Sequence, residues 1–207
     1  MTANHISRRF IFISIVALAF CGIAIHWVTA RASASRHENA VAVLDSNECH
    51  VLCEGELGST SHSMCWWVLA RLPSNPFHEV AEAYIENRSR EDVLKILSSL
   101  PDGCCIRMLS LDGSDIHDDD LFLLRKIKGI RTLWLGNCPH ITETGLKNIQ
   151  SQTEIIRLHI NGNDVSDSVF PVIRNLPLIE LNVRDTHVTP EGIRMYKHSH
   201  KGVIVSM

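Results

Sequence analysis

The 207-residue sequence has few of the residues that mark an extended or disordered chain. It contains only 11 glycines and 7 prolines, which excludes a collagen-like or linker-dominated protein. Charged residues make up 21% of the chain and hydrophobic residues 45%, so the chain can form a packed core. The 20 basic and 23 acidic residues leave a net charge of −3, which gives no reason to expect a nucleic-acid partner.

Motifs of common enzymes are also missing. The chain has no Gly-x-Ser-x-Gly elbow, no glycine-rich loop that could hold a phosphate, and no His-Glu-x-x-His sequence. We therefore expect a protein that is not an enzyme. No motif calls for a cofactor.

The hydrophobic residues are spread unevenly along the chain. Residues 10–30 carry no charge and reach the length of about 20 that a helix needs to cross a bilayer. Arg8 and Arg9 precede this run, which favours an amino terminus in the cytoplasm. The sequence thus predicts a cytoplasmic amino terminus at 1–9, a transmembrane signal anchor at 10–30, a linker at 31–39 and a carboxy-terminal part outside the cytoplasm.

A cleaved export signal is the alternative. His26 shortens the strictly apolar part of the run, and Ala30, Ala32 and Ala34 form small-x-small sequences after it, as in a secretory signal peptide. The sequence Ser7-Arg8-Arg9 also allows a twin-arginine signal. Cleavage would leave a secreted or periplasmic protein, so the remainder is exported in each case.

A repeating pattern occupies the second half of the chain, in segments that begin at Ile106, Ile130, Ile155 and Leu178. Each segment has a leucine three residues after its first residue and another apolar residue two places further on. The leucines are Leu109, Leu133, Leu158 and Leu181, and they are 24, 25 and 23 residues apart. Such a period indicates stacked supersecondary units, none of which buries its apolar side alone.

The rest of each segment continues the match. A small polar or cysteine side chain comes next, at Ser114, Cys138, Asn163 and Thr186, and it can bond to the backbone of a turn. Apolar residues follow at Ile116, Ile141, Val165 and Val188, and further apolar pairs then come three residues apart, which is helical spacing. We therefore expect a strand, a turn and a helix in each segment.

Two of the turns carry a resemblance. Residues 141–146 (ITETGL) and 188–193 (VTPEGI) resemble the I-T-D-x-G-L element of cysteine-containing leucine-rich repeats, and Cys138 stands in the cysteine position. The Ile106 and Ile155 segments keep the apolar spacing but lose the glycine. The whole plan is similar to membrane-anchored leucine-rich repeat proteins of planctomycete-type bacteria. The resemblance implies an α/β fold, a short solenoid with a parallel sheet on its concave face, that serves as a binding scaffold.

The flanks of the pattern suggest caps. Residues 80–105 look like a degenerate first segment, in which Val80, Ala83 and Ile85 form a strand and Ser89 caps a helix with Asp92 at its third position. Residues 40–79 are expected to cover the open end as an amino-terminal cap. Residues 203–205 are expected to form a closing strand, so the repeats span 80–207.

A binding surface, if present, is expected on the concave face. Strand residues next to the buried leucines point to the opposite side of the sheet, because side chains alternate along a strand. The candidate binding residues on this face are Ser110, Trp134, Arg157, His159, Asn182 and Arg184. An exposed tryptophan beside an arginine and a histidine is typical of interfaces, although it can also be a lone surface residue.

Cysteines and histidines offer weaker candidates for chemistry. Cys49, Cys53, His62 and Cys65 are residue types that bind zinc, but their spacing matches no standard zinc finger. A disulfide or unpaired buried thiols remain open for the same cysteines. Asp118, Asp119 and Asp120 are expected at the start of a helix, where carboxylates are favoured, rather than around calcium. We also expect His198 and His200 on a loop.

These observations predict a non-enzymatic, membrane-anchored binding or scaffold protein. Its partner would be a protein or a glycan, bound through the concave face. One alternative is a metal-binding or redox module at residues 49–65. The other is a structural envelope protein that associates with copies of itself.

Overall fold

The computed structural model describes residues 32, 35–36, 38–53 and 80–207. Contacts divide the chain into two compact units, and the elements described below belong to the one formed by Arg36–Ser61 and Phe77–Met207. The predicted membrane segment 10–30 lies outside the described residues. Within the described part, no helix is both long enough and apolar enough to cross a bilayer.

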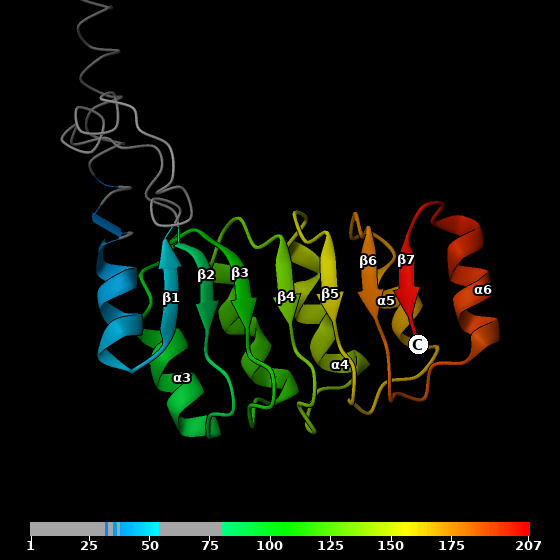
Figure 1. Cartoon of the computed structure of the whole chain (residues 1–207), viewed down its shortest axis with the longest axis horizontal. Coiled ribbons are helices and arrows are strands. Elements are labelled where there is room, and N and C mark those ends of the chain that lie inside the picture. Colours follow the sequence, from blue (N-terminus) through cyan, green and yellow to red (C-terminus); the bar gives the residue numbers. More distant parts are fainter. Residues whose placement is uncertain (1–31, 33–34, 37, 54–79) are drawn as a thin grey trace, which may run out of the picture. The chain divides into compact units, whose positions relative to one another are not determined.

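The protein is α/β, with one sheet of seven strands in chain order (Figure 1). The first pair of strands is antiparallel and all the following neighbours are parallel. The strands are β1 His50–Cys53, β2 Val80–Tyr84, β3 Ile106–Ser110, β4 Thr132–Trp134, β5 Arg157–His159, β6 Glu180–Asn182 and β7 Ile204–Ser206.

Short helices connect the parallel strands, and in Figure 1 the helix between β6 and β7 lies beside β7 at the end of the sheet. They are α3 Arg90–Ser99, η1 Asp118–Lys126, α4 Glu143–Leu146, η2 Lys147–Ser151, α5 Val169–Ile173 and α6 Pro190–Ser199. The expected strand, turn and helix are therefore present in each segment. The expected helices of the Ile106 and Ile130 segments are, however, wholly or partly 3₁₀ helix, which short connections commonly adopt.

The four repeated leucines align across the sheet. Leu109 pairs with Leu133, Leu133 with Leu158, and Leu158 with Leu181, and all four are fully buried. Burying a leucine side chain stabilises a fold by about 1.5–3 kcal/mol. A spacing of one leucine per strand thus builds a continuous core between the sheet and the helices.

The residues before the first parallel strand also pack on this core. Residues 38–46 are helical, and Ala40 and Leu44 within them are fully buried. Residues 38 and 39 are thus helical, although the sequence predicted a linker over 31–39, and this helix adds to the cap because Ala40 and Leu44 have a core to join. β1 pairs with β2 at this edge of the sheet.

The predictions for the remaining elements differ in detail. Ser89 caps α3 by accepting a hydrogen bond from the backbone N–H of Asp92, as expected. The closing strand is Ile204–Ser206, one residue later than predicted, and it pairs with β6. The prediction of a loop around His198 was wrong, because α6 continues to Ser199 and His200 ends it.

Small side chains of the turns bond to turn backbone, as predicted, and in three of them the acceptor lies just after the strand of the preceding segment. The Ser114 hydroxyl donates to the carbonyl of Ile85 at 2.8 Å, and the Cys138 thiol donates to that of Leu111 at 3.3 Å. The amide of Asn163 donates to the carbonyl of Leu135 at 2.7 Å and accepts from the N–H of Cys138 at 2.8 Å. These bonds satisfy backbone groups that would otherwise be buried without partners.

A carboxylate at the start of one helix caps the next helix along the chain. Asp118 accepts hydrogen bonds from the backbone N–H and the hydroxyl of Thr142, at 2.7 and 2.6 Å. Asp167 accepts the same two bonds from Thr189, at 2.8 and 2.6 Å. A side chain at Gly145 or Gly192 would collide with these aspartates. The glycine of each ITETGL-like turn therefore makes room for the carboxylate of the preceding segment.

Two segments lack this glycine. The segment before each of them presents a side chain that is longer than aspartate or has the opposite charge. Glu143 replaces aspartate and bonds to Ser166 and Ser168, which leaves room for Val169 in the glycine position. In the segment before Ile106, Arg90 takes the part of the capping carboxylate. It forms a bidentate pair with Asp120, which stands in the glycine position of the Ile106 segment, at 2.8 and 2.9 Å. Each segment without the glycine therefore has a different capping side chain in the segment before it.

Replacing Glu143 with glutamine is expected to reduce stability at neutral pH by about 1 kcal/mol, because charge-assisted hydrogen bonds are lost at a partly exposed site. Burial alone would raise the pKa of Glu143, but hydrogen bonds from Ser168 and Ser166 outweigh it and lower the pKa from 4.5 to about 2. A folded-state pKa below the unfolded value means that this stability is present above about pH 4.5 and is lost as the pH falls toward 2.

Urea unfolding of the wild type and Glu143→Gln at several pH values measures this effect. The difference in the free energy of unfolding between the two proteins should decrease as the pH falls from about 4.5 toward 2. The exposed Glu154 provides a control, since Glu154→Gln should show no comparable change with pH. A difference for Glu143→Gln that is independent of pH would contradict the role assigned to the carboxylate.

Candidate functional site

One face of the sheet is free of helices in Figure 1, and we call it the open face. Its two central rows come from aligned strand positions, because paired residues of parallel strands lie side by side. These residues are Glu82, Met108, Thr132, Arg157 and Glu180 in one row and Tyr84, Ser110, Trp134, His159 and Asn182 in the other. The predicted binding residues thus come from neighbouring strands of one face.

Trp134 and His159 form the centre of this face. Their rings stack with centroids 4.7 Å apart and planes 25° from parallel. Both side chains are half-buried, so the prediction of a freely exposed tryptophan was wrong: its neighbour in the adjacent strand covers part of the ring. The indole N–H is buried and has no hydrogen-bond partner among the described residues.

Two charged side chains flank the aromatic pair. The Arg157 guanidinium lies 3.3 Å from the Glu180 carboxylate, and Nε2 of His159 lies 3.8 Å from the same group. Arg157 and Glu180 remain 47% and 36% exposed, so their ion pair adds at most about 1 kcal/mol to stability. We call Trp134, Arg157, His159 and Glu180 the Trp134 cluster.

The Trp134 cluster has an uncharged centre. Burial lowers the pKa of His159 below 6.5, although the nearby carboxylates of Glu180 and Asp112 act in the opposite direction. The imidazole is therefore neutral at pH 7. A neutral histidine against a tryptophan, next to an arginine and a glutamate, can offer apolar contact and both kinds of charged hydrogen bond to a partner.

Ser110 does not belong to this surface, and its assignment as a binding residue was wrong. The side chain is fully buried, and its hydroxyl donates a hydrogen bond to Glu86. Ser110 pairs with Tyr84 on one side and Trp134 on the other. A small side chain between two large rings is covered by them, so alternation along the strand alone does not make it accessible.

The two remaining candidates lie beside the cluster. The Asn182 amide donates to Oδ1 of Asn161 at 3.3 Å, and its own oxygen accepts from the backbone N–H of Arg184 at 3.2 Å. Arg184 is exposed. Both residues thus extend the polar margin of the open face without joining the Trp134 cluster.

The cysteine candidates are only partly described. Cys49 is buried and forms no disulfide, and burial raises the pKa of its thiol. The side chain of Cys53, together with His62 and Cys65, lies outside the described residues. The metal or redox module at residues 49–65 therefore stays a prediction.

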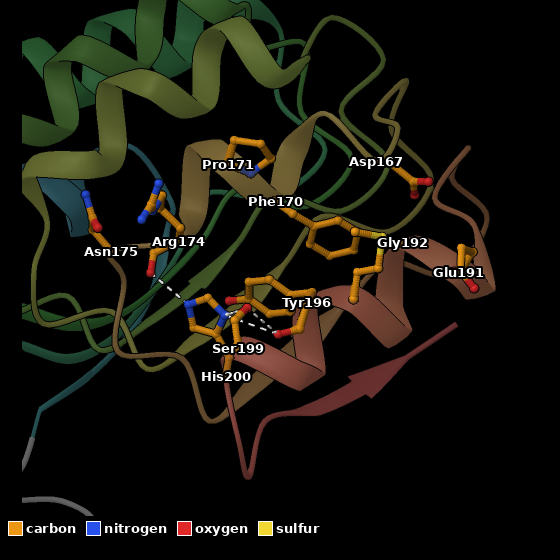
Figure 2. A pocket seen from close by; sticks show the side chains of 11 residues that line it. Asp167, Phe170, Pro171, Arg174, Asn175, Glu191, Gly192, Tyr196, Ser199 and His200 are labelled. Carbon is orange, nitrogen blue, oxygen red and sulfur yellow. Dashed lines mark hydrogen bonds between the residues drawn. The ribbon is translucent and has the colours of Figure 1, made fainter.

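A groove of about 610 Å³ lies between α5 and α6, on the helix side of the sheet (Figure 2). Phe170, Tyr196 and His200 stack in succession, with centroids 4.8 and 4.2 Å apart. Nε2 of His200 donates to the carbonyl of Arg174 at 2.9 Å. Burial raises the pKa of Tyr196 to about 12. This histidine is thus held within a packed aromatic stack.

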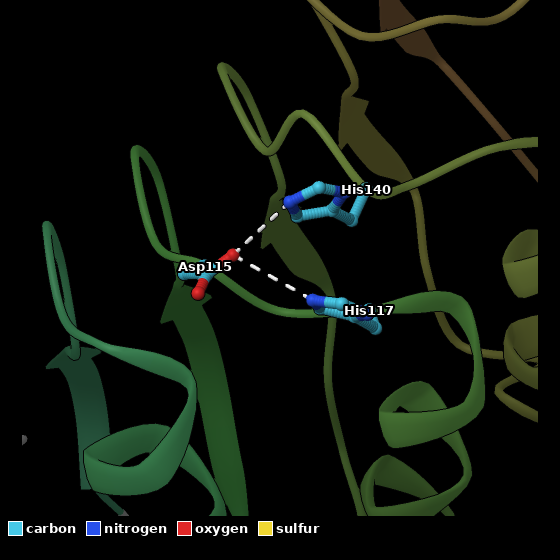
Figure 3. Close-up of side chains that lie close together, drawn as sticks. All are labelled: Asp115, His117 and His140. Atoms are coloured by element: carbon cyan, nitrogen blue, oxygen red, sulfur yellow. Dashed lines mark ion pairs between the residues drawn. The ribbon is translucent and has the colours of Figure 1, made fainter.

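A second polar cluster was missed by sequence reasoning. Asp115, His117 and His140 lie on the turns after β3 and β4, with potential ligand atoms within 4.8 Å of one another (Figure 3). The signal was available: Asp115 precedes Ile116 and His140 precedes Ile141, and these two isoleucines occupy equivalent positions in the repeat alignment. Residues from equivalent positions face each other between neighbouring segments.

Comparison with known proteins adds no family to this description. No family model and no curated protein sequence matches the chain.

Proposed function

We propose that this chain is a leucine-rich repeat protein that binds a partner protein through the open face of its sheet. Residues 10–30 tether it to a membrane as a signal anchor, with the repeats outside the cytoplasm. Its role is non-enzymatic: the repeats form a short solenoid that presents a rigid surface.

The repeat assignment is supported by the way neighbouring segments join. The strand leucines lie in register, and the side chains in the asparagine or cysteine position bond to the turns. The carboxylates of Asp118, Glu143 and Asp167 each cap the following segment. A structure whose segments contact mainly their neighbours is what a solenoid requires.

The single observation that carries the binding proposal is the Trp134 cluster itself. It places an aromatic pair between exposed charges on a surface that strands hold in position. Tryptophan and arginine are enriched among residues that dominate interface energies. A surface ion pair contributes little to stability, so the charged residues are better explained by contact with a partner.

The ring geometry favours a protein over a glycan. One face of Trp134 stacks on His159, and Ser110, which pairs with Trp134 from the strand on the other side, is fully buried. A sugar that stacks on tryptophan needs a free ring face, whereas a protein side chain can pack against the ring edge and pair with Arg157 or Glu180. The ring geometry is therefore less suited to a glycan partner than to a protein partner.

The double variant Trp134→Ala/Arg157→Ala is expected to lower partner capture at least tenfold. Removing an interface tryptophan and arginine typically costs more than about 2 kcal/mol of binding free energy. The measurement is crosslinking and affinity capture of the full chain from envelope extract of the source cells, followed by quantification of the captured protein. Because Trp134 is half-buried, the thermal midpoint should also fall by several degrees, and capture is measured below it.

A matched control is available on the helix side. Phe122 is 53% exposed and Arg125 is also exposed, both on η1, so Phe122→Ala/Arg125→Ala likewise removes one aromatic residue and one arginine, but elsewhere. This control should capture the partner as the wild type does. Equal loss in both double variants, or none in either, would contradict binding at the Trp134 cluster. Capture of this chain alone would instead support a self-associating envelope protein.

A further inference from the structure

We propose that Asp115, His117 and His140 bind a divalent transition-metal ion, with Zn²⁺ as the best match. We call these residues the Asp-His-His cluster. They lie on the turns that follow β3 and β4, away from the six predicted binding residues of the open face. The proposed site therefore shares no residue with the Trp134 cluster.

The two histidine rings converge on one carboxylate oxygen. Nε2 of His117 lies 3.6 Å from Oδ1 of Asp115, and Nε2 of His140 lies 3.4 Å from the same atom. Figure 3 shows both rings directed toward this oxygen from one side. The rings lie next to each other, with centroids 4.3 Å apart and planes inclined by 32°.

These distances are too long for direct hydrogen bonds and suit a shared metal ion. A nitrogen–oxygen hydrogen bond measures about 2.7–3.2 Å. Zinc binds imidazole nitrogen and carboxylate oxygen at about 2.0–2.2 Å, so two ligands of a tetrahedral ion lie about 3.3–3.5 Å apart. The separations of 3.4 and 3.6 Å match this ligand spacing closely. Two imidazoles with one carboxylate also form a donor set that binds zinc in preference to harder cations such as Mg²⁺ or Ca²⁺.

The backbone holds the ligands before any metal binds. The backbone N–H of Asp115 donates to the carbonyl of Arg88 at 2.9 Å, and that of His117 donates to the Asp120 carboxylate at 3.0 Å. His117 and His140 also form a parallel β-bridge. Little conformational freedom is lost on binding, because two neighbouring segments already present the ligands together.

Solvent can reach the site and complete the coordination. The side chains of Asp115 and His140 are 52% exposed and that of His117 is 36% exposed. Three protein ligands leave one position of a tetrahedron for water. An ion held there would join the Ile106 segment to the Ile130 segment, so metal binding should also stabilise the fold.

The later turns of the repeats contain a similar pair of residues that can serve as a control. His187 and Asp164 occupy the positions equivalent to His140 and Asp115, and their Nε2 and Oδ1 atoms are 3.4 Å apart. Ser166 stands where the first cluster has His117, and it forms the same bridge to His187. This pair has one histidine and one carboxylate, so it lacks the third ligand.

The test measures zinc bound to the full chain by equilibrium dialysis at low micromolar free Zn²⁺, with thiols kept reduced. Wild type should bind one zinc more per chain than His140→Ala or Asp115→Asn. The control His187→Ala should bind as much as the wild type. Zinc should also raise the thermal midpoint of the wild type and of His187→Ala, with a smaller rise in His140→Ala.

A gain-of-function variant gives an independent measurement. Ser166→His supplies the missing imidazole beside His187 and Asp164, so it should bind one zinc more than the wild type. Cobalt substitution adds a spectroscopic readout, because the Asp-His-His cluster predicts tetrahedral cobalt bands without thiolate charge transfer.

The proposal is overturned if His140→Ala binds as much zinc as the wild type, or if His187→Ala loses the same amount. Cobalt spectra dominated by thiolate charge transfer in both wild type and His140→Ala would also overturn it, because the ion would then lie at the cysteines. Folding of each variant is checked by circular dichroism. His140 and His187 are both on exposed turns, so their replacement should leave the fold intact.

Discussion

Replacing Gly145 with alanine is expected to lower the free energy of unfolding by about 2–4 kcal/mol. The added Cβ would lie 2.8 Å from the Cα of Asp118, so the backbone of the preceding segment must move. Overpacking of this kind costs about 1–3 kcal/mol, and the bonds from Thr142 to Asp118 would weaken as well. The higher helix propensity of alanine offsets up to about 1 kcal/mol. Urea unfolding of the full chain measures the change.

Gly192→Ala is the matched control, because there the three atoms nearest to the added Cβ all belong to the carboxylate of Asp167 and none to its backbone. A side chain can rotate away more easily than a backbone atom, so the expected cost is about 1 kcal/mol. The double variant Asp118→Glu/Gly145→Val imitates the natural combination of Glu143 and Val169 and should recover part of the loss. Gly145→Ala as stable as the wild type would contradict the proposed packing.

Replacing Asn163 with leucine is expected to cost about 2–5 kcal/mol. Asn163 is 3% exposed, and its amide bonds to the carbonyl of Leu135 and the N–H of Cys138. Leucine has the same branched shape as asparagine but leaves both backbone groups buried and unpaired, at about 1–3 kcal/mol each. Urea unfolding measures the loss, and hydrogen exchange should be faster at the Cys138 amide in particular.

Thr186→Val tests the same turn position in the next segment. The Thr186 hydroxyl bonds within its own turn, donating to the carbonyl of Val183 and accepting from the backbone N–H of Val188 at 3.3 Å, and the side chain is half-buried. We expect a cost of about 1 kcal/mol. If the two substitutions cost the same, the bridge from Asn163 to the neighbouring segment would not be the stabilising feature.

The repeated apolar positions were sufficient to predict one strand in each segment, and the family resemblance added the parallel sheet. Leu109, Leu133, Leu158 and Leu181 recur once per segment, and stacking of equivalent strands places them in one buried row. Capping chemistry is equally local: Ser89 lies three residues before Asp92, so the start of α3 follows from the sequence. Both features depend on short-range geometry that every segment repeats.

Contacts between polar side chains of neighbouring segments were harder to predict. The capping pairs Asp118–Thr142, Glu143–Ser166 and Asp167–Thr189 are 24, 23 and 22 residues apart, so no single period identifies them. A shift of one residue in a turn changes which side chains face each other. This is why the Arg90–Asp120 pair was missed.

The sequence by itself determined which residues form the core, because burial follows the strand and helix periods that leucine and isoleucine obey. It also determined the position of the open face, since side chains alternate along each strand. Only the tertiary structure decided which of those side chains a partner can reach. Ser110 is covered by its larger neighbours and Trp134 by His159. Exposure depends on the size of neighbours that are distant in sequence, so it becomes defined only once the strands are side by side.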